Sequence, residues 1–259
     1  MQWEGIADMK SRSFLTYEKP ILTCMVQADN PDRIKELIEL SRPEGAEAFG
    51  MQFCRMKKEY RNKETYKKLF EKANPLPVYV TNYRGAENEG KSDDILGAEL
   101  IELAECGATL CDVMGDYFDH CEGELTMNDE AVKKQIKLIN ELHSRGAEVL
   151  MSSHVLKHIT AERVLEIANE HQRRGADICK IVVGAETMAQ QIENLRILDL
   201  LKRELGIPFL FLSGGECSII RRIGTSLGSC MSLCVHEQDD FSTPTQPLLR
   251  DMKKIRELI

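Results

Sequence analysis

The sequence has 259 residues, with 34 Lys and Arg against 42 Asp and Glu, so its formal net charge is −8. This acidic balance excludes a nucleic-acid binder that works by neutralising phosphates. Hydrophobic residues make up 42% of the chain, which is globular composition and argues against disorder. No segment approaches the roughly 18 consecutive apolar residues of a membrane span. The N-terminus also lacks the basic-then-apolar order of a signal peptide, so we expect a cytoplasmic protein without membrane contact.

Short apolar runs alternate with charged stretches of helical spacing along the chain. This alternation is typical of β/α units around a parallel sheet. The predicted strands are residues 21–26, 47–53, 77–81, 109–113, 148–152, 177–183, 208–212 and 230–235. The predicted helices between and after them are residues 31–40, 59–72, 93–105, 128–144, 160–174, 187–205, 218–223 and 244–258.

A Gly-Ala pair precedes four of the predicted strands, at Gly45, Gly107, Gly146 and Gly175. Glycine can end the preceding helix in a left-handed conformation, and four copies of this device indicate repeated β/α units. Eight strands and eight helices over about 240 residues favour a (β/α)₈ TIM barrel. An open sheet would more usually carry a glycine-rich loop after its first strand, and residues 26–31 contain no glycine. We therefore predict one barrel domain over residues 1–259, with residues 1–20 as an extension before the first strand.

Nine cysteines are scattered along the chain without a Cys-x-x-Cys pair or zinc-ligand spacing. Several of them lie inside apolar runs, where a free cysteine behaves as a small buried hydrophobe. The pattern predicts reduced core thiols and no metal site.

Lys180 lies inside a predicted strand, where a solvated lysine is unusual. Burial disfavours the charged form, and a neutral amine can attack a carbonyl to form a Schiff base. The alternative is a lysine that reaches the barrel mouth and pairs with a carboxylate such as Glu186. His154 follows the preceding strand, so the two side chains are expected within reach of each other, and an imidazole suits acid–base work. His158 competes on composition, but position at the strand end favours His154.

Residues after the seventh and eighth strands provide candidate ligands for an anion. Glycine-rich turns at this place in a barrel often bind anions, and Arg221 could clamp a carboxylate with two hydrogen bonds. Ser242 and Gln246 offer a hydroxyl and an amide next to a helix start that Pro244 would favour. The alternative for that segment is an ordinary N-cap loop.

Together these motifs resemble the type I 3-dehydroquinate dehydratase family of the shikimate pathway, a (β/α)₈ fold. The family's Ser-x-His-x-Phe stretch is similar to residues 152–156, and its Gly-Ala-Asp-Ile-x-Lys-Ile stretch matches residues 175–181. The arginine–glycine stretch matches residues 220–229, and Ser-x-Pro-x-Gln matches residues 242–246. The resemblance covers the chain from residue 21 onward.

The resemblance implies a hydro-lyase that converts 3-dehydroquinate to 3-dehydroshikimate in aromatic amino acid biosynthesis. Lys180 would form an imine with the ring ketone, and His154 would move the protons. Arg221 would hold the substrate carboxylate, with Ser242 and Gln246 bonding that group or nearby hydroxyls. The implied reaction needs no metal and no organic cofactor, and its partner is a small-molecule carboxylate.

The sequence also departs from the family pattern. The Glu-x-Arg of the second strand is Gly50-Met51-Gln52 here, and the Asp-x-Glu of the fourth strand ends in Met114. The Thr-x-Arg and Glu-Gly-Gly elements appear with shifted spacing, which assigns Arg84 and Glu89 to substrate binding. Gln52 is assigned to the same pocket. These changes affect the part of the pocket that would bind the ring hydroxyls of the substrate.

Two other functions follow from those departures. The chain could be a related Schiff-base lyase or aldolase-like enzyme acting on a different polyhydroxy keto acid. It could also be a barrel that binds a carboxylate without chemistry, although a pure binder has no need for a buried amine. The sequence allows a homodimer, which is common among such barrels. The polar loop at residues 236–246 is compatible with a lid or with a solvated surface loop.

Overall fold

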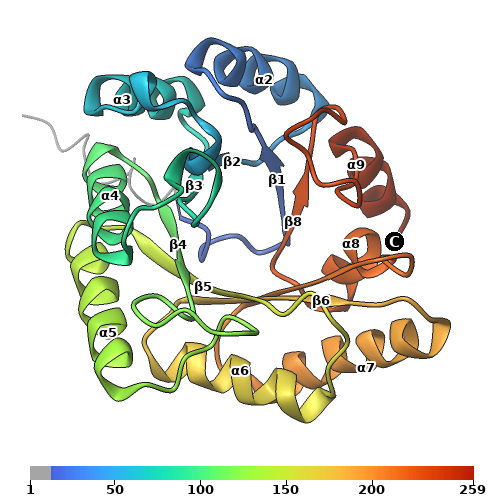
Figure 1. Ribbon diagram of the computed structural model, residues 1–259. Helices are drawn as coiled ribbons and strands as arrows, with labels where there is room; N and C mark the ends of the chain where they lie inside the picture. Colours follow the sequence, from blue (N-terminus) through green and yellow to red (C-terminus); the bar gives the residue numbers. More distant parts are fainter. Residues whose placement is uncertain (1–12) are drawn as a thin grey trace, which may run out of the picture.

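Eight strands form one parallel sheet that curls into a nearly closed barrel with helices around its outside (Figure 1). The computed structural model describes residues 13–259. The strands are β1 (Ile21–Met25), β2 (Ala48–Gln52), β3 (Val78–Thr81), β4 (Leu110–Met114), β5 (Glu148–His154), β6 (Ile178–Gly184), β7 (Phe209–Gly214) and β8 (Met231–Cys234). Strands β1 to β7 pair in sequence order, and β8 pairs with β1. Just before β8, the backbone N–H of Cys230 donates to the Phe209 carbonyl of β7 at 2.8 Å. The predicted TIM barrel is confirmed.

Five of the helices around the barrel begin at a residue whose side chain caps the helix. Asn30, Asn62, Asn128, Thr160 and Thr187 each accept a hydrogen bond from a backbone N–H of the first helical turn. The helices are α2 (Pro31–Glu44), α3 (Lys63–Ala73), α4 (Asp93–Cys106), α5 (Asp129–Ser144), α6 (Ala161–Arg173), α7 (Met188–Glu204), α8 (Ile220–Ile223) and α9 (Leu249–Leu258). Short 3₁₀ turns add η1 (Phe53–Arg55), η2 (Lys58–Tyr60), η3 (Ala86–Asn88) and η4 (Gly224–Leu227).

The last helix begins later than predicted, at Leu249 and not at Pro244. The N–H of Val235 donates to Pro247 at 3.0 Å, and the N–H of Leu249 donates back to Val235 at 2.8 Å. Residues 247–248 therefore run beside the chain that leaves β8, and the helix starts only after this pairing ends. The expected helix start at Pro244 was wrong for this reason.

The four Gly-Ala pairs behave as the sequence predicts. Gly45, Gly107, Gly146 and Gly175 have φ between 79° and 115°, the left-handed region that favours glycine. The nine cysteines, at positions 24 to 234, are all free thiols.

The barrel interior is filled by side chains from alternate strand positions, including Leu110, Leu150, Ile178 and Leu210. Phe14 belongs to the same cluster, and its N–H donates to Glu148 at 2.8 Å. Residues 13–20 thus cover the end of the barrel where the strands begin, and the functional side chains lie toward the other end. Residues 1–12 of the expected extension lie outside the described residues. Within residues 13–259, no helix is long and apolar enough to cross a membrane.

Candidate active site

A cavity of about 220 Å³ opens among the strands and the loops that follow them. Both Lys180 and His154 line it. This is the region in which barrel enzymes place their active sites. The other lining residues used below are Met25, Gln27, Gln52, Arg55, Tyr79, Tyr83, Arg221 and Gln246.

Lys180 lies in the middle of β6 and points into the barrel interior. Its neighbours two residues away, Ile178 and Val182, belong to the interior cluster, and Lys180 itself is 4% exposed. The Nζ atom donates to Asp112 Oδ2 at 3.1 Å, to Tyr79 Oη at 3.1 Å and to Tyr83 Oη at 2.6 Å. The suggested pairing with Glu186 at the barrel mouth is wrong, because Asp112 provides a buried counter-ion closer to the amine.

Asp112 is the centre of this polar cluster and is fully buried. Burial acts to raise the pKa of its carboxyl, but the charge of Lys180 and the hydrogen bonds from Ser152 and the two tyrosines outweigh it and lower the pKa. Ser152 Oγ donates to Oδ1 at 2.6 Å, and Tyr83 Oη donates to Oδ2 at 2.5 Å. Tyr79 Oη also donates to Oδ2. Asp112 is therefore ionised at neutral pH.

Tyr79 and Tyr83 keep their phenolic protons. Burial and the neighbouring charge of Asp112 raise the pKa of both hydroxyls well above 10. Each hydroxyl can consequently accept from the Lys180 ammonium and donate to Asp112 at the same time.

His154 ends β5, next to Lys180 on the neighbouring strand, with Ser152 opposite Lys180 in the register. Glu124 Oε2 lies 2.7 Å from the imidazole Nδ1 and accepts from the His154 backbone N–H at 2.9 Å. A carboxylate at Nδ1 assigns the proton to that nitrogen and leaves Nε2 as an acceptor. The ring of Tyr83 stands edge-on to the imidazole, with centroids 5.2 Å apart.

Glu124 comes from the loop between β4 and α5, and its placement depends on close backbone packing. Burial acts to raise its pKa, and the hydrogen bond and charge of His154 lower it overall. Its carbonyl accepts from Ser153 Oγ at 2.6 Å. A Cβ on Gly115 would lie 2.4 Å from that same carbonyl oxygen, so this approach requires glycine at position 115.

A neutral histidine lies beneath Ser153. His171 Nε2 is 3.0 Å from Ser153 Oγ, and Nδ1 is 3.3 Å from Cys179 Sγ. Burial is the main cause that lowers the pKa of His171 to about 3. The imidazole is therefore uncharged at neutral pH and supports the strand end that carries His154.

Arg221 reaches the cavity from α8. Its Nε donates to the Ser213 carbonyl at 2.6 Å, and within residues 13–259 this is the only hydrogen-bond partner of the side chain. Burial lowers its pKa to about 10, so the side chain stays charged at neutral pH. The two terminal nitrogens are thus available for a ligand, and binding of an anion there stays a prediction.

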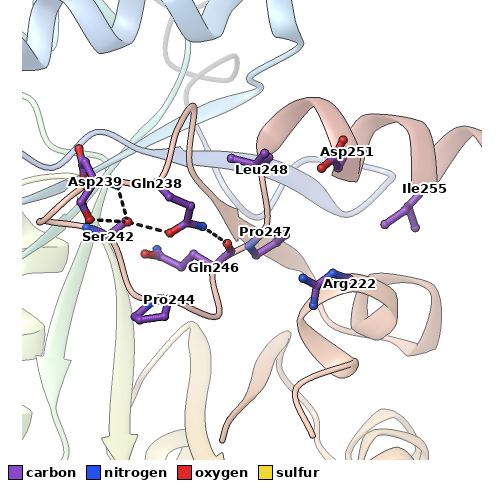
Figure 2. A pocket seen from close by; sticks show the side chains of 10 residues that line it. All are labelled: Arg222, Gln238, Asp239, Ser242, Pro244, Gln246, Pro247, Leu248, Asp251 and Ile255. Atoms are coloured by element: carbon purple, nitrogen blue, oxygen red, sulfur yellow. Dashed lines mark hydrogen bonds between the residues drawn. The ribbon is translucent and has the colours of Figure 1, made fainter. Parts of the chain in front are cut away.

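Gln52 and Gln246 also line the cavity, whereas Ser242 does not. Gln246 Oε1 accepts from the Thr243 N–H at 2.7 Å, and Gln52 Nε2 contacts Cys54 Sγ at 3.3 Å. A second cavity, of about 470 Å³, lies between residues 238–248, α8 and α9. Figure 2 shows Ser242 directed at Gln238 and Asp239 at this cavity. Ser242 Oγ lies within hydrogen-bond distance, 2.9 Å, of both Gln238 Oε1 and the Asp239 carbonyl oxygen.

Arg84 and Glu89 also lie away from the cavity. The Arg84 guanidinium pairs with Asp93 at 2.6 Å and with Asp116 at 2.8 Å, and Glu89 is exposed. The structure therefore does not bring these two residues together with Lys180 and His154.

Gly50 occupies the place where the resemblance expects a glutamate. A Cβ built there would lie 2.1 Å from Met25 Sδ and 3.2 Å from the Tyr79 ring. Met25 and Tyr79 therefore fill the space that a side chain at position 50 would need. From there the Tyr79 hydroxyl contacts Lys180 Nζ.

Sequence reasoning did not assign Tyr79, Tyr83, Asp112, Glu124 or Arg55 to the site. Asp112 carries the same signal as Lys180, because it is a charged residue inside an apolar strand. Glu124 gave no such signal, since it lies in an irregular loop whose path depends on the packed fold.

Comparison with known proteins gives a consistent result. A family model described as type I 3-dehydroquinase matches residues 23–259. A 3-dehydroquinate dehydratase from Geobacillus kaustophilus is 16% identical with a TM-score of 0.81, and the match covers 95% of each chain. A type I enzyme from Clostridium difficile, solved with covalent modified comenic acid, is 18% identical with a TM-score of 0.79 over 94% of each chain. The enzyme from Enterococcus faecalis is 16% identical with a TM-score of 0.77, covering 96% of this chain and 98% of that one. No curated protein matches the sequence.

Proposed function

The chain belongs to the type I 3-dehydroquinase family, and on that premise we propose that it is a lyase that forms an imine with a cyclic keto acid and eliminates water. The first substrate we propose is 3-dehydroquinate, with 3-dehydroshikimate as product. The observation that carries the proposal is the buried Lys180–Asp112 pair, with His154 facing the same cavity from the adjacent strand.

Lys180 begins the reaction. Its amine attacks the ring ketone, and loss of water from the resulting carbinolamine leaves an iminium ion. The iminium withdraws electrons from the adjacent carbon and acidifies its C–H bond.

His154 carries out the elimination. Its free Nε2 removes the proton next to the iminium, and the protonated imidazole returns a proton to the hydroxyl that leaves from the next carbon. Glu124 stabilises the imidazolium through Nδ1. Hydrolysis of the conjugated iminium then releases the enone and restores the Lys180 amine.

Arg221 is the proposed ligand of the substrate carboxylate. Its terminal nitrogens have no protein partner within residues 13–259. Gln246 and Gln52 are the proposed partners of nearby oxygens, since both line the cavity. Arg84, Glu89 and Ser242 are not included in the proposed site, because their side chains bond elsewhere.

A different polyhydroxy keto acid is the second candidate substrate. Gly50 has no side chain that could contact a ring hydroxyl, and Met25 and Tyr79 occupy the space where such a side chain would lie. A buried hydroxyl without a partner costs binding free energy, so a substrate with another hydroxyl pattern could fit better.

The test is turnover, followed through the absorbance of the conjugated enone. The wild type is assayed with 3-dehydroquinate and with a panel of cyclic and open-chain keto acids. Lys180→Met should lower kcat/KM by at least about 1,000-fold because the nucleophile is lost. His154→Gln should lower kcat by about 100- to 10,000-fold.

Lys157→Met provides the matched control, because Lys157 is an exposed lysine in an ion pair with Glu122. Faster turnover of another keto acid would replace the proposed substrate by the second candidate. A wild-type protein that turns over none of the panel would contradict the proposed chemistry and favour a carboxylate-binding barrel. A Lys180→Met variant that keeps its activity would instead show that catalysis does not depend on an imine at Lys180.

A further inference from the structure

Tyr83 stands between the two proposed catalytic residues. It lies two residues beyond the end of β3, is partly buried and lines the cavity. Its ring is edge-on to His154, and its hydroxyl contacts both Lys180 and Asp112. The hydroxyl is therefore close to the atom at which the proposed substrate becomes covalently attached.

The hydroxyl forms a short hydrogen-bonded chain. Lys180 Nζ donates to Tyr83 Oη at 2.6 Å, and Tyr83 Oη donates to Asp112 Oδ2 at 2.5 Å. The second distance is at the short end of the range for a hydroxyl that donates to a carboxylate. Tyr79 makes the same two kinds of contact, but it is fully buried and 3.1 Å from Nζ.

Imine formation requires proton movements at this place. An ammonium must lose a proton before it attacks, and the carbinolamine hydroxyl must gain one before it leaves as water. Asp112 can hold that proton, but it is fully buried behind Lys180, Ser152 and the two tyrosines. Tyr83 contacts Asp112 and is also partly exposed at the cavity.

We propose that Tyr83 is a catalytic residue of this chain that relays the proton between Lys180, Asp112 and the carbinolamine oxygen. This proposal rests on the proposed imine-forming function. In the forward direction, Nζ gives a proton to Tyr83 Oη as Tyr83 gives its own proton to Asp112, which leaves a neutral amine and a carboxylic acid.

The second half of the relay restores both groups. The amine adds to the ketone, and a proton passes from nitrogen to oxygen to give the neutral carbinolamine. Tyr83 then donates its proton to the carbinolamine hydroxyl and takes the proton of Asp112. The C–O bond breaks, water leaves, and the products are the iminium ion and the Asp112 carboxylate. No proton is gained or lost beyond the water released.

If Tyr83 moves the protons of imine formation, His154 is needed only for the later proton transfers. Its Nδ1 is held by Glu124, so a single nitrogen faces the cavity chemistry. With Tyr83 serving imine formation, Nε2 serves the removal of the carbon-bound proton and the loss of the β-hydroxyl.

The experiment measures imine formation alone, by rapid mixing with 3-dehydroquinate, or with the best keto acid of the panel, followed by borohydride and intact mass. Tyr83→Phe should slow trapping by about 100-fold, the low end of the range for general acid–base groups. Tyr79→Phe is the matched control, and the loss of one hydrogen bond there should slow trapping roughly fivefold.

Binding of a substrate analogue that lacks the ketone separates a relay from a collapsed site. Its Kd should change less than about threefold in Tyr83→Phe, because the proposal assigns no binding role to the hydroxyl. A loss of affinity that parallels the loss of trapping would show a structural role and overturn the relay.

A second modification keeps the test decisive if Tyr83→Phe does not fold. 3-Fluorotyrosine at position 83 retains the shape and makes the phenol more acidic, so trapping should accelerate about threefold, while the same change at position 79 should not. Equal trapping rates in the wild type and the position-83 variants would overturn the relay and leave the lyase intact. A wild type that forms no adduct with any keto acid would overturn the lyase and the relay together.

Discussion

The two sides of the cavity are built differently. On the side of β3 to β6, Lys180 bonds to Asp112 at 3.1 Å, and His154 bonds to Glu124 at 2.7 and 2.9 Å. On the side of β1, β2, β7 and β8, the Arg221 side chain has a single hydrogen-bond partner among residues 13–259, and Arg55 is exposed. The proposed reacting groups are thus fixed before a substrate arrives, whereas the proposed recognition group Arg221 keeps its terminal nitrogens available for a ligand.

The difference indicates which part of this chain determines its substrate. The proposed chemistry depends on the first side, where every group has a partner. The departures at Gly50 and Gln52 lie on the second side, where contacts to substrate oxygens are proposed. We therefore expect mutations on the first side to affect stability and rate, and mutations on the second side to affect KM.

The largest effect on the first side is expected from Asp112→Asn. The substitution leaves the Lys180 ammonium buried without its counter-ion, and breaking a buried pair costs about 3–5 kcal/mol. Denaturant unfolding should show this decrease in the free energy of unfolding. Asp199→Asn, in an exposed pair with Arg203, is the control and should cost less than about 1 kcal/mol. A variant as stable as the control would refute the view that this pair organises the site.

On the second side, Arg221→Met should raise KM for a carboxylate substrate by about 10- to 100-fold, the cost of a lost charge-assisted bond. The rate of imine trapping at saturating substrate should stay nearly constant. Arg222→Met is the matched control and should leave KM unchanged, because the adjacent Arg222 lines the second cavity, shown in Figure 2. A fall in kcat at unchanged KM would contradict a recognition role for Arg221.

The pH dependence of stability tests the support beneath His154. His171 has a pKa of about 3 in the folded protein and about 6.5 when unfolded, so the unfolded state binds more protons between these values. The stability from this group is complete above about pH 6.5 and is lost as the pH falls toward 3. From pH 7 to pH 5 the wild type should lose about 2 kcal/mol more unfolding free energy than His171→Leu. Parallel curves for the two proteins would show that His171 is not held neutral.

The smallest effect is expected from Gly50→Ala. The added Cβ would lie 2.1 Å from Met25 Sδ, so Met25 must move. Because methionine is flexible, the cost should be about 1 kcal/mol, the low end for overpacking. Thermal unfolding measures this change, and Gly214→Ala is the control, since nothing lies within 4 Å of a Cβ there. Equal melting temperatures would show that the space at position 50 is not tightly filled.

The fold was predictable from local patterns, and so were some of the polar residues that strands carry. Hydrophobic periodicity and turn residues located each strand. Lys180 was selected as a charged residue inside an apolar strand, and His154 from the rule that barrel sites lie where strands end. Arg84 was assigned because it is an arginine near the expected spacing, but Asp93 and Asp116 bind its guanidinium. Tyr83, its neighbour, faces the cavity instead. The direction in which a loop side chain points depends on tertiary packing, and the residues adjacent to it in the sequence do not reveal that packing.

The hydrogen-bond partners were harder to predict than the reacting groups. Glu124 lies 30 residues from His154 in the sequence, and only the path of residues 115–128 brings them together. Tyr79 contacts Lys180 from a distance of 101 residues, in a space that Gly50 leaves open. Such contacts depend on the closure of the barrel and on side-chain volumes across several strands.

The most direct test of the account is the site of covalent attachment. The protein is treated with 3-dehydroquinate, or with the best keto acid of the panel, and borohydride, then digested and mapped by mass spectrometry. We predict a ligand-sized mass gain on the peptide that contains Lys180, and no such gain in Lys180→Met. An adduct confined to an exposed lysine such as Lys157, or no adduct on folded protein with any substrate of the panel, would contradict it.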